Sequence, residues 1–299
     1  MQLSLGPIFY YWPRQQVEDF YHQALDSPAD IVYLGETVCP KRREVHSSEW
    51  LEMAAPLAEA GKQVVLSTLA LIESRADLAT LRKLCDQSGC LMEANDMAAV
   101  ELLSERNLPF VAGPSINIYN SASLRVLQQA GMMRWVMPVE LSRHTLQGIL
   151  EEVQQFGFAE QVQTEIFSYG HLPLAYSARC FTARNHNLPK DDCQLSCLDY
   201  PDGIPVHTRE NTSLFTLNGI QTLSGDIHNL LAEYHDMAAI GVDILRISPT
   251  GSNTFQVLEQ FDRIRRGETL SNQLSASDQG AATFCNGYWY GKPGMDLAQ

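Results

Sequence analysis

Cysteines are the residues in this sequence whose type and spacing best suggest chemistry. The chain has seven of them, at positions 39, 85, 90, 180, 193, 197 and 285. Cys180, Cys193 and Cys197 lie close together on a stretch rich in Asp, Asn and Pro, whereas a buried structural thiol normally lies in an apolar run. Thiolates on such a stretch suit the ligation of a soft metal.

Three thiolate ligands need a fourth, and Cys39 is the candidate. It follows a predicted strand at Ile31–Leu34, in the segment Gly35-Glu36-Thr37-Val38-Cys39-Pro40. In a (β/α) barrel, every loop that follows a strand opens on the same face. We therefore expect Cys39 to meet the distant cysteines at the mouth of a barrel.

The spacing leaves two kinds of site open. Cys193 and Cys197 could form one half of a structural zinc site, but Cys39 and Cys180 come singly from distant loops, which does not suit the other half. Iron–sulfur ligands scatter more freely, so the spacing favours a cluster over zinc. Cys85 and Cys90 lie in apolar patterns and are expected to be core residues, and Cys285 is assigned a structural role.

Eight short apolar runs, separated by segments of helical period, are the elements that must position these cysteines. This alternation predicts parallel strands with right-handed crossovers, and we expect an α/β fold of the (β/α)8 TIM-barrel type. The sequence contains no nucleotide-binding glycine loop, and its absence weakens the alternative of an open sheet. The strands are predicted at Leu3–Leu5, Ile31–Leu34, Val64–Ser67, Cys90–Glu93, Phe110–Ala112, Arg134–Met137, Glu165–Phe167 and Asp243–Ile247. Helical stripes lie at 17–24, 78–84, 146–156 and 255–264, with Ser142 as an N-cap.

One long excursion, Gly170–Gly225, interrupts this alternation after the seventh strand and carries three of the cysteines. Leu214–Leu217 and Ile220–Leu223 flank Asn218-Gly219, a strong signal for a β-hairpin. We expect a single barrel domain over residues 1–267, with an insertion at 170–225, and a C-terminal tail at 268–299 that packs on the barrel. The tail carries Tyr288-Trp289-Tyr290, and exposed aromatic residues often anchor interfaces with a partner.

Composition narrows the functional class. The 299 residues include 21 Lys and Arg and 35 Asp and Glu, so the net charge is −14. This acidic balance makes nucleic acid an unlikely partner, because phosphate contacts need a basic face. With no apolar run long enough for a membrane span and no signal peptide at the N-terminus, we expect a cytoplasmic location and reduced cysteines.

Several polar residues lie at or near the predicted strand ends, where catalytic groups of barrels are found. Among them, Glu36, Glu165 and His171 are the candidates for moving protons beside a metal centre; the others are Glu93, Asn95, Asn117 and Arg246. The basic run Lys41–Arg43 could neutralise the charge of a cluster, bind an acidic ligand, or form a solvated loop.

Three motifs resemble those of the peptidase U32 (collagenase-like) family: Cys39-Pro40-Lys41-Arg42-Arg43, the run from Glu165 to Cys180, and a Pro-Lys-Asp-Asp-Cys run that precedes Cys197. The resemblance covers nearly the whole chain. It implies a [4Fe–4S] cluster on Cys39, Cys180, Cys193 and Cys197. It also implies a hetero-oligomer with a second family member. This complex would hydroxylate quinone precursors without O2 during anaerobic ubiquinone synthesis. The alternatives are a U32-type peptidase or an RNA-hydroxylation factor with a metal site, and a scaffold whose cluster only stabilises the fold.

Overall fold

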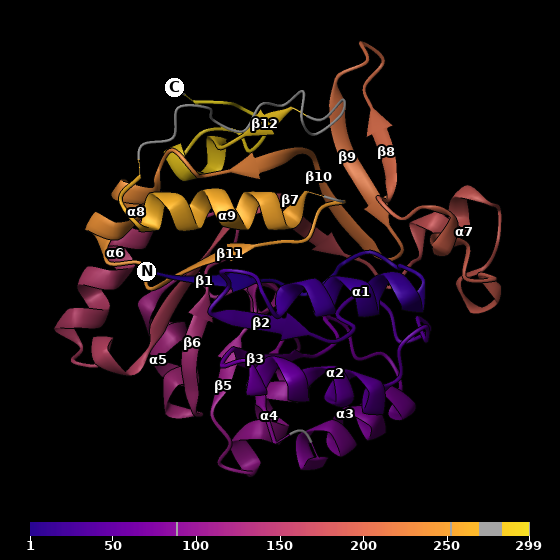
Figure 1. Cartoon of the computed structure of the whole chain (residues 1–299), viewed down its shortest axis with the longest axis horizontal. Coiled ribbons are helices and arrows are strands. Elements are labelled where there is room, and N and C mark those ends of the chain that lie inside the picture. The colour runs from indigo at the N-terminus through magenta and orange to yellow at the C-terminus, as the bar shows by residue number, and fades with distance from the viewer. Residues whose placement is uncertain (88, 252, 269–282, 299) are drawn as a thin grey trace.

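The computed structural model describes residues 1–87, 89–251, 253–268 and 283–298, and eight of its strands close into a parallel barrel (Figure 1). The barrel strands are β1 (Gln2–Leu5), β2 (Ile31–Leu34), β3 (Gln63–Ser67), β4 (Leu91–Ala94), β5 (Phe110–Ala112), β6 (Met132–Val136), β7 (Gln163–Tyr176) and β11 (Ile244–Ile247). Strand β11 pairs with both β1 and β7, which closes the ring. The predicted barrel class and all eight predicted strands are confirmed.

Helices between the strands cover the outside of the barrel. They are α1 (Arg14–Ala24), α2 (Ser47–Glu59), α3 (Arg75–Gln87), α4 (Met97–Glu105), α5 (Ser121–Gln129), α6 (Arg143–Gln155), α8 (Tyr234–Ile240) and α9 (Thr254–Arg265). The four predicted helical stripes fall in α1, α3, α6 and α9. Ser142 caps α6 as expected, because its side chain accepts a hydrogen bond from the backbone N–H of Thr145. None of the helices in the described ranges is long and apolar enough to cross a membrane.

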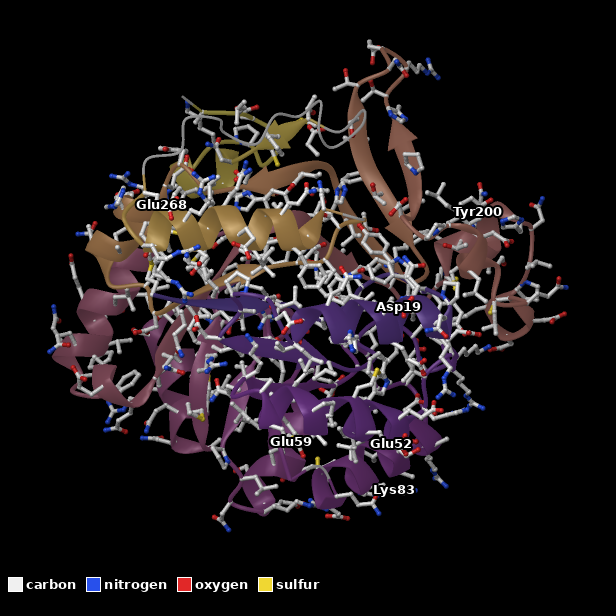
Figure 2. The ribbon with its side chains drawn as sticks, in the orientation of Figure 1. Asp19, Glu52, Glu59, Lys83, Tyr200 and Glu268 are labelled. Atoms are coloured by element: carbon white, nitrogen blue, oxygen red, sulfur yellow. The ribbon has the colours of Figure 1, made fainter. Side chains whose placement is uncertain are left out.

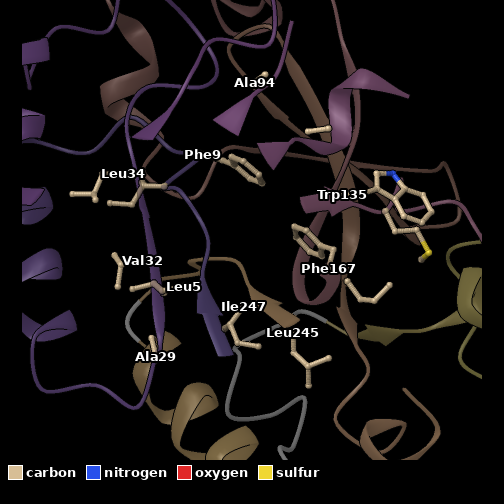
Figure 3. Packing of buried hydrophobic residues seen from close by; sticks show 14 of the residues in the cluster. Leu5, Phe9, Ala29, Val32, Leu34, Ala94, Trp135, Phe167, Leu245 and Ile247 are labelled. Carbon is tan, nitrogen blue, oxygen red and sulfur yellow. The ribbon is translucent and has the colours of Figure 1, made fainter. Parts of the chain in front are cut away.

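Buried apolar side chains form two layers, because both faces of each parallel strand are covered. The larger layer packs the outer faces of the strands against the helices, and Figure 3 shows Leu5, Val32 and Leu34 within it. The smaller layer fills part of the barrel interior and consists of Ile31, Tyr33, Val65, Val111, Val136 and Ile244. Alternate residues of β2 therefore point to opposite layers, as the pleat requires.

Charged side chains fill the rest of the barrel interior. The guanidinium of Arg246 donates from Nε to Glu165 Oε1 at 2.7 Å and from Nη1 to Glu93 Oε1 at 2.8 Å. It also lies over the ring of Tyr33, 4.1 Å from the ring centroid. Each of these three charged side chains is at most 1% exposed. One cation thus joins two carboxylates that are buried from water.

The carboxylate of Glu165 is the most heavily bonded group of this network. It accepts hydrogen bonds from the hydroxyls of Ser4 at 2.6 Å and Tyr33 at 2.5 Å, and Arg134 Nε lies 3.8 Å away. Burial alone would raise the pKa of Glu165, but the charges of Arg246 and Arg134 outweigh it and hold the pKa below its usual value. Glu165 therefore stays ionised inside the barrel.

The excursion grows directly out of the barrel. Strand β7 runs beyond the barrel to Tyr176, and β10 (Gln221–Asn229) pairs antiparallel with this extension. Strands β9 (Ser213–Asn218) and β8 (Ile204–His207) continue the same sheet and project from the body of the molecule in Figure 1. The predicted hairpin is present as β9–β10, but its turn is Gly219-Ile220 and not Asn218-Gly219, because Asn218 pairs with Gln221. Asn218 belongs to the strand since its side chain is buried and hydrogen-bonded to Phe9, Arg42 and Gln221.

The described part of the C-terminal tail packs against the barrel. Strand β12 (Phe284–Cys285) pairs with β10, and a 3-10 helix, η6, follows at Gly287–Tyr290. The interpretation of Trp289 as an exposed anchor is wrong: the side chain is 2% exposed and its indole N–H donates to Asp236 Oδ2 at 3.2 Å. Residues 269–282 of the expected tail lie outside the described residues.

Replacing Arg246 with Met should destabilise the fold by about 3–5 kcal/mol at pH 7, since it leaves Glu93 and Glu165 buried without their cation. The loss should shrink as the pH falls from 7 towards 5. In the variant, burial raises the pKa of the stranded carboxyls, so the cost of ionising them is present above that raised pKa and lost below it. Urea unfolding at several pH values measures both effects.

The matched control is Arg263→Met, which breaks an ion pair with Glu268 whose side chains are 45% and 43% exposed. Exposed pairs contribute at most about 1 kcal/mol. Equal losses in the two variants would contradict a supporting role for the interior network.

Candidate functional site

The loop after β2 positions Cys39. Gly35 begins it with a φ of +121°, and a Cβ at that position would lie 2.5 Å from the carbonyl oxygen of Ser67. Glu36 then accepts hydrogen bonds at Oε1 from the backbone N–H groups of Val38 at 2.8 Å and Cys39 at 3.0 Å. The glycine lets the loop turn close to β3, and the carboxylate fixes the backbone that carries the thiol.

Three short helical segments of the excursion carry the other cysteines. Cys180 precedes the five-residue helix α7 (Phe181–Asn185), Cys193 follows the 3-10 helix η3 (Lys190–Asp192), and Cys197 lies within η4 (Ser196–Asp199). Gln194 and Leu195, between the last two cysteines, have φ values of +50° and +54°. Two consecutive non-glycine residues in the left-handed region are costly and persist only where the surroundings hold them.

Burial raises the pKa of two of the four thiols. It is the largest cause for Cys39, whose pKa it raises to about 11, and for Cys197. Charge on Cys180 or Cys193 adds to the rise at Cys197, and charge on Cys197 adds to the rise at Cys39.

N–H groups lie beside three of the four sulfur atoms. The backbone N–H of Ala183 donates to Cys180 Sγ at 3.4 Å. The backbone N–H of Lys41 lowers the pKa of Cys39 and the Arg42 guanidinium lowers the pKa of Cys197, so both oppose the effect of burial and favour the thiolate.

Arg42 holds the loop of Cys39 against the excursion. Its side chain is 1% exposed, and it donates from Nη1 to the carbonyl of Phe9 at 2.6 Å and from Nη2 to Asn218 Oδ1 at 2.7 Å. Nη1 also lies 3.7 Å from Glu36 Oε1. A single buried cation thus contacts the segment before α1, the loop of Cys39 and the end of β9.

The β9–β10 turn holds the other side of the site. The carbonyl of Gly219 accepts from the N–H of Phe181 at 2.7 Å, and the N–H of Gly219 donates to Thr182 Oγ1 at 3.0 Å. Gly219 has a φ of +63°, and a Cβ there would lie 3.1 Å from Arg42 Nη2. The turn therefore fixes the helix that follows Cys180 and leaves room for the guanidinium.

Lys41 and Lys190 connect the loops that carry the cysteines. Lys41 Nζ donates to the carbonyl of Lys190 at 2.8 Å and lies 3.3 Å from Asp191. Lys190 Nζ in turn donates to the carbonyl of Ala178 at 2.9 Å and pairs with Glu73. The segment before Cys193 is thereby joined to the loops that carry Cys39 and Cys180.

The four cysteines offer the donor atoms of a thiolate-bound metal centre, but their sulfur atoms are not arranged around a common point in this structure. Within the described ranges, no group of three or more His, Cys, Asp or Glu side chains is arranged to hold a metal ion. The four cysteines are partly exposed, and rotation about single bonds can redirect their sulfur atoms. Four thiols on loops that are joined to one another, with N–H groups beside three of them, fit a cluster, whose properties depend on such N–H groups.

The three candidate proton-transfer residues occupy different places. Glu36 adjoins Cys39, and burial raises the pKa of its carboxyl while Arg42 opposes the shift. Glu165 lies in the barrel interior with 0% exposure. His171 lies on the β7 extension, where Nδ1–H donates to the carbonyl of Ser224 at 2.8 Å and burial lowers the pKa of the ring.

The remaining cysteines lie apart from this set. Cys85 is buried on α3 beside the core, as expected. Cys90 is partly buried just before β4, and Cys285 is 1% exposed on β12. No disulfide joins any two of the seven cysteines, all of which belong to the described part of the chain.

The roles of Arg42 and Asn218 are not evident from the sequence. The sequence places Arg42 in a basic run near the predicted cluster and Asn218 in a predicted turn, whereas in the structure the two side chains are hydrogen-bonded to each other. An Asn that precedes Gly gives the same local signal whether it turns the chain or ends a strand. Only the hydrogen-bond partners of the Asn side chain, which the folded structure shows, distinguish a turn from a strand end.

Comparison with known proteins relates the chain to one family. The model of peptidase family U32 matches residues 16–292. A solved U32 peptidase is 13% identical, over 84% of this chain and 94% of its own, with a TM-score of 0.45. Dihydropteroate synthase from Thermus thermophilus is also 13% identical, over 88% and 94% of the two chains, with a TM-score of 0.40.

Replacing Arg42 with Met should lower the free energy of unfolding by about 3–5 kcal/mol, because buried acceptors on three segments lose their cation. Arg43→Met is the matched control, since the neighbouring side chain is exposed and its loss should change stability by at most about 0.5 kcal/mol. Chemical denaturation measures both, and hydrogen exchange should show the extra opening in residues 213–225. Equal stability of the two variants would contradict the connecting role of Arg42.

Proposed function

Since the chain belongs to peptidase family U32, we propose that it is a UbiV-like iron–sulfur protein that acts in the O2-independent hydroxylation steps of ubiquinone biosynthesis. Its partner is a related, UbiU-like subunit of the same family, and the substrate of the complex is a quinone precursor. The reaction takes place in the cytoplasm. Cys39, Cys180, Cys193 and Cys197 hold a [4Fe–4S] cluster.

The observation that carries this proposal is that hydrogen bonds join the loop of Cys39 to the excursion that carries Cys180, Cys193 and Cys197, about 140 residues away. The N–H groups beside three sulfurs and the strained backbone between Cys193 and Cys197 support a site built for thiolate ligands. A stabilising core thiol would need none of these features. The buried Arg42 offsets part of the negative charge of such a set.

A cluster at this place would supply electron transfer for a hydroxylation that cannot use O2. The chain's own residues bind it, limit the access of water and tune its surroundings through the three N–H donors. The Glu36 carboxylate accepts a hydrogen bond from the backbone N–H of Cys39 and can hold a proton beside that residue. The chain thus serves as the redox subunit of the complex.

The structure offers no support for a serine or threonine peptidase. Among the described residues, no histidine ring is hydrogen-bonded to a serine or threonine hydroxyl, and Nδ1–H of His171 donates to the backbone carbonyl of Ser224. In that class of peptidase a neighbouring base activates the hydroxyl. The net charge of −14 disfavours the modification of RNA, because phosphate contacts need a basic face.

Replacing Cys39, Cys180, Cys193 or Cys197 with Ala should sharply lower the iron bound to anaerobically purified protein, because each change removes a ligand. Cys85→Ala and Cys90→Ala are matched controls and should retain nearly all of it. Iron analysis and the absorption of thiolate–iron charge transfer near ~400 nm measure the outcome. A colourless protein with stoichiometric zinc, or iron loss confined to the control variants, would overturn the cluster.

Cells that lack this chain should make normal ubiquinone in air but accumulate under-hydroxylated precursors without oxygen. The wild-type gene should restore anaerobic synthesis, Cys85→Ala should do so as well, and Cys197→Ala should not. Quinone extraction and mass spectrometry measure this. Unchanged anaerobic ubiquinone in the deletion strain would reject the function.

Gel filtration after co-expression with the UbiU-like subunit should show one hetero-oligomer. A stable monomer in the presence of the partner would reject the complex.

A further inference from the structure

A cavity of about 310 Å³ opens beside the loop of Cys39, between the starts of α2 and α3 and the end of β3. Glu36, Pro40 and Arg42 belong to its wall, so it adjoins the cysteine set. In Figure 2, Glu52 and Lys83 mark the two helices that flank it. Its volume is at the lower end of the range for small-molecule sites, about 300–1,000 Å³.

Uncommitted polar groups gather at one end of this cavity. Arg43 and Ser47 line it, and neither side chain has a hydrogen-bond or ion-pair partner among the described residues. Arg42 lines it as well; this side chain is buried, and its Nε has no hydrogen-bond partner in the structure. The N-terminus of α2, a helix of 13 residues, begins at Ser47 and adds a positive dipole end.

The acidic groups that face the cavity are already bonded. Glu36 accepts from two backbone N–H groups and lies near Arg42. Asp77 accepts from the backbone N–H of Ser74 at 2.9 Å, at the start of α3. His46 and Glu49 already cap the N-terminus of α2. The Arg43 guanidinium, the Ser47 hydroxyl and Nε of Arg42 are therefore the groups left to meet a ligand, and the two cations select an anion.

Apolar side chains form the rest of the wall. They are Trp50, Leu66, Leu69, Ile72, Leu81 and Leu84. Trp50 is 9% exposed and its ring is fixed edge-on by Tyr21, with the ring centroids 5.9 Å apart. A rigid aromatic face opposite leucines favours a flat apolar body over a hydrated one.

We propose that this cavity binds an aromatic acid, with its carboxylate on Arg43 and Ser47 and its ring against Trp50. The assignment of this acid to the ring substrate rests on the proposed function. The binding site itself follows from the cavity, its two arginines and its apolar wall. Because Arg42 lines the cavity, a ring held there would lie in this subunit, close to the loop of Cys39.

The test is calorimetric titration of the anaerobically purified full chain with 2-naphthoate, with its neutral analogue 2-naphthylmethanol, and with acetate. Naphthoate should bind saturably with one site, the alcohol about tenfold more weakly, and acetate too weakly to measure. Arg43→Gln should weaken naphthoate binding about tenfold and leave the alcohol unchanged, since only the charged hydrogen bonds are lost. Leu84→Asn, in the apolar wall, should weaken both.

Arg125→Gln is the matched control: it removes one exposed guanidinium, which lies over the ring of Phe156 on a different part of the surface, and it should leave all three affinities unchanged. Equal naphthoate affinity in wild type and Arg43→Gln, or no saturable binding by the wild type, would overturn the site. Iron analysis of the same samples separates the two proposals. Binding by iron-free protein supports the site and counts against the cluster, whereas iron-loaded protein that binds no naphthoate overturns the site alone.

Discussion

The buried guanidinium of Arg42 is the contact on which the arrangement of the cysteines depends. A cation out of reach of water must be partnered, and the partners of Arg42 come from three segments: Phe9, Glu36 and Asn218. The contacts of Arg42 with these partners hold the loop of Cys39 against the turn that supports Cys180. Because the buried charge needs these partners, it fixes the relative positions of distant parts of the chain.

Strand β7 makes the same site continuous with a rigid scaffold. Its first residues belong to the barrel, where Glu165 joins the interior ion pairs, and its last residues pair with β10 beneath the excursion. The excursion is therefore an extension of the barrel sheet and not a loosely attached loop. Rigid support of this kind matters for electron transfer and for ligand binding, because both require that groups keep their positions.

Arg42 and Arg43 have different roles at the boundary between the cysteine loops and the neighbouring cavity. Arg42 turns inward, where its contacts hold the loops together and reach Cys197. Arg43 remains exposed and lines the neighbouring cavity. A chain with a net charge of −14 thus keeps a local positive end beside a group of thiols.

The sequence by itself determined the barrel and the candidate ligands. Apolar runs and helical stripes are set by near neighbours in the chain, so the eight strands and the four stripes could be predicted from local pattern. The cysteines stood out because they lie where a core thiol does not belong. Only the tertiary structure decided that Glu165 is an interior ion-pair partner, that Asn218 ends a strand to receive Arg42, and that Trp289 is buried. These outcomes depend on which polar and aromatic groups meet across long stretches of chain, and a buried charge or indole is identified by its partner and not by its neighbours in the sequence.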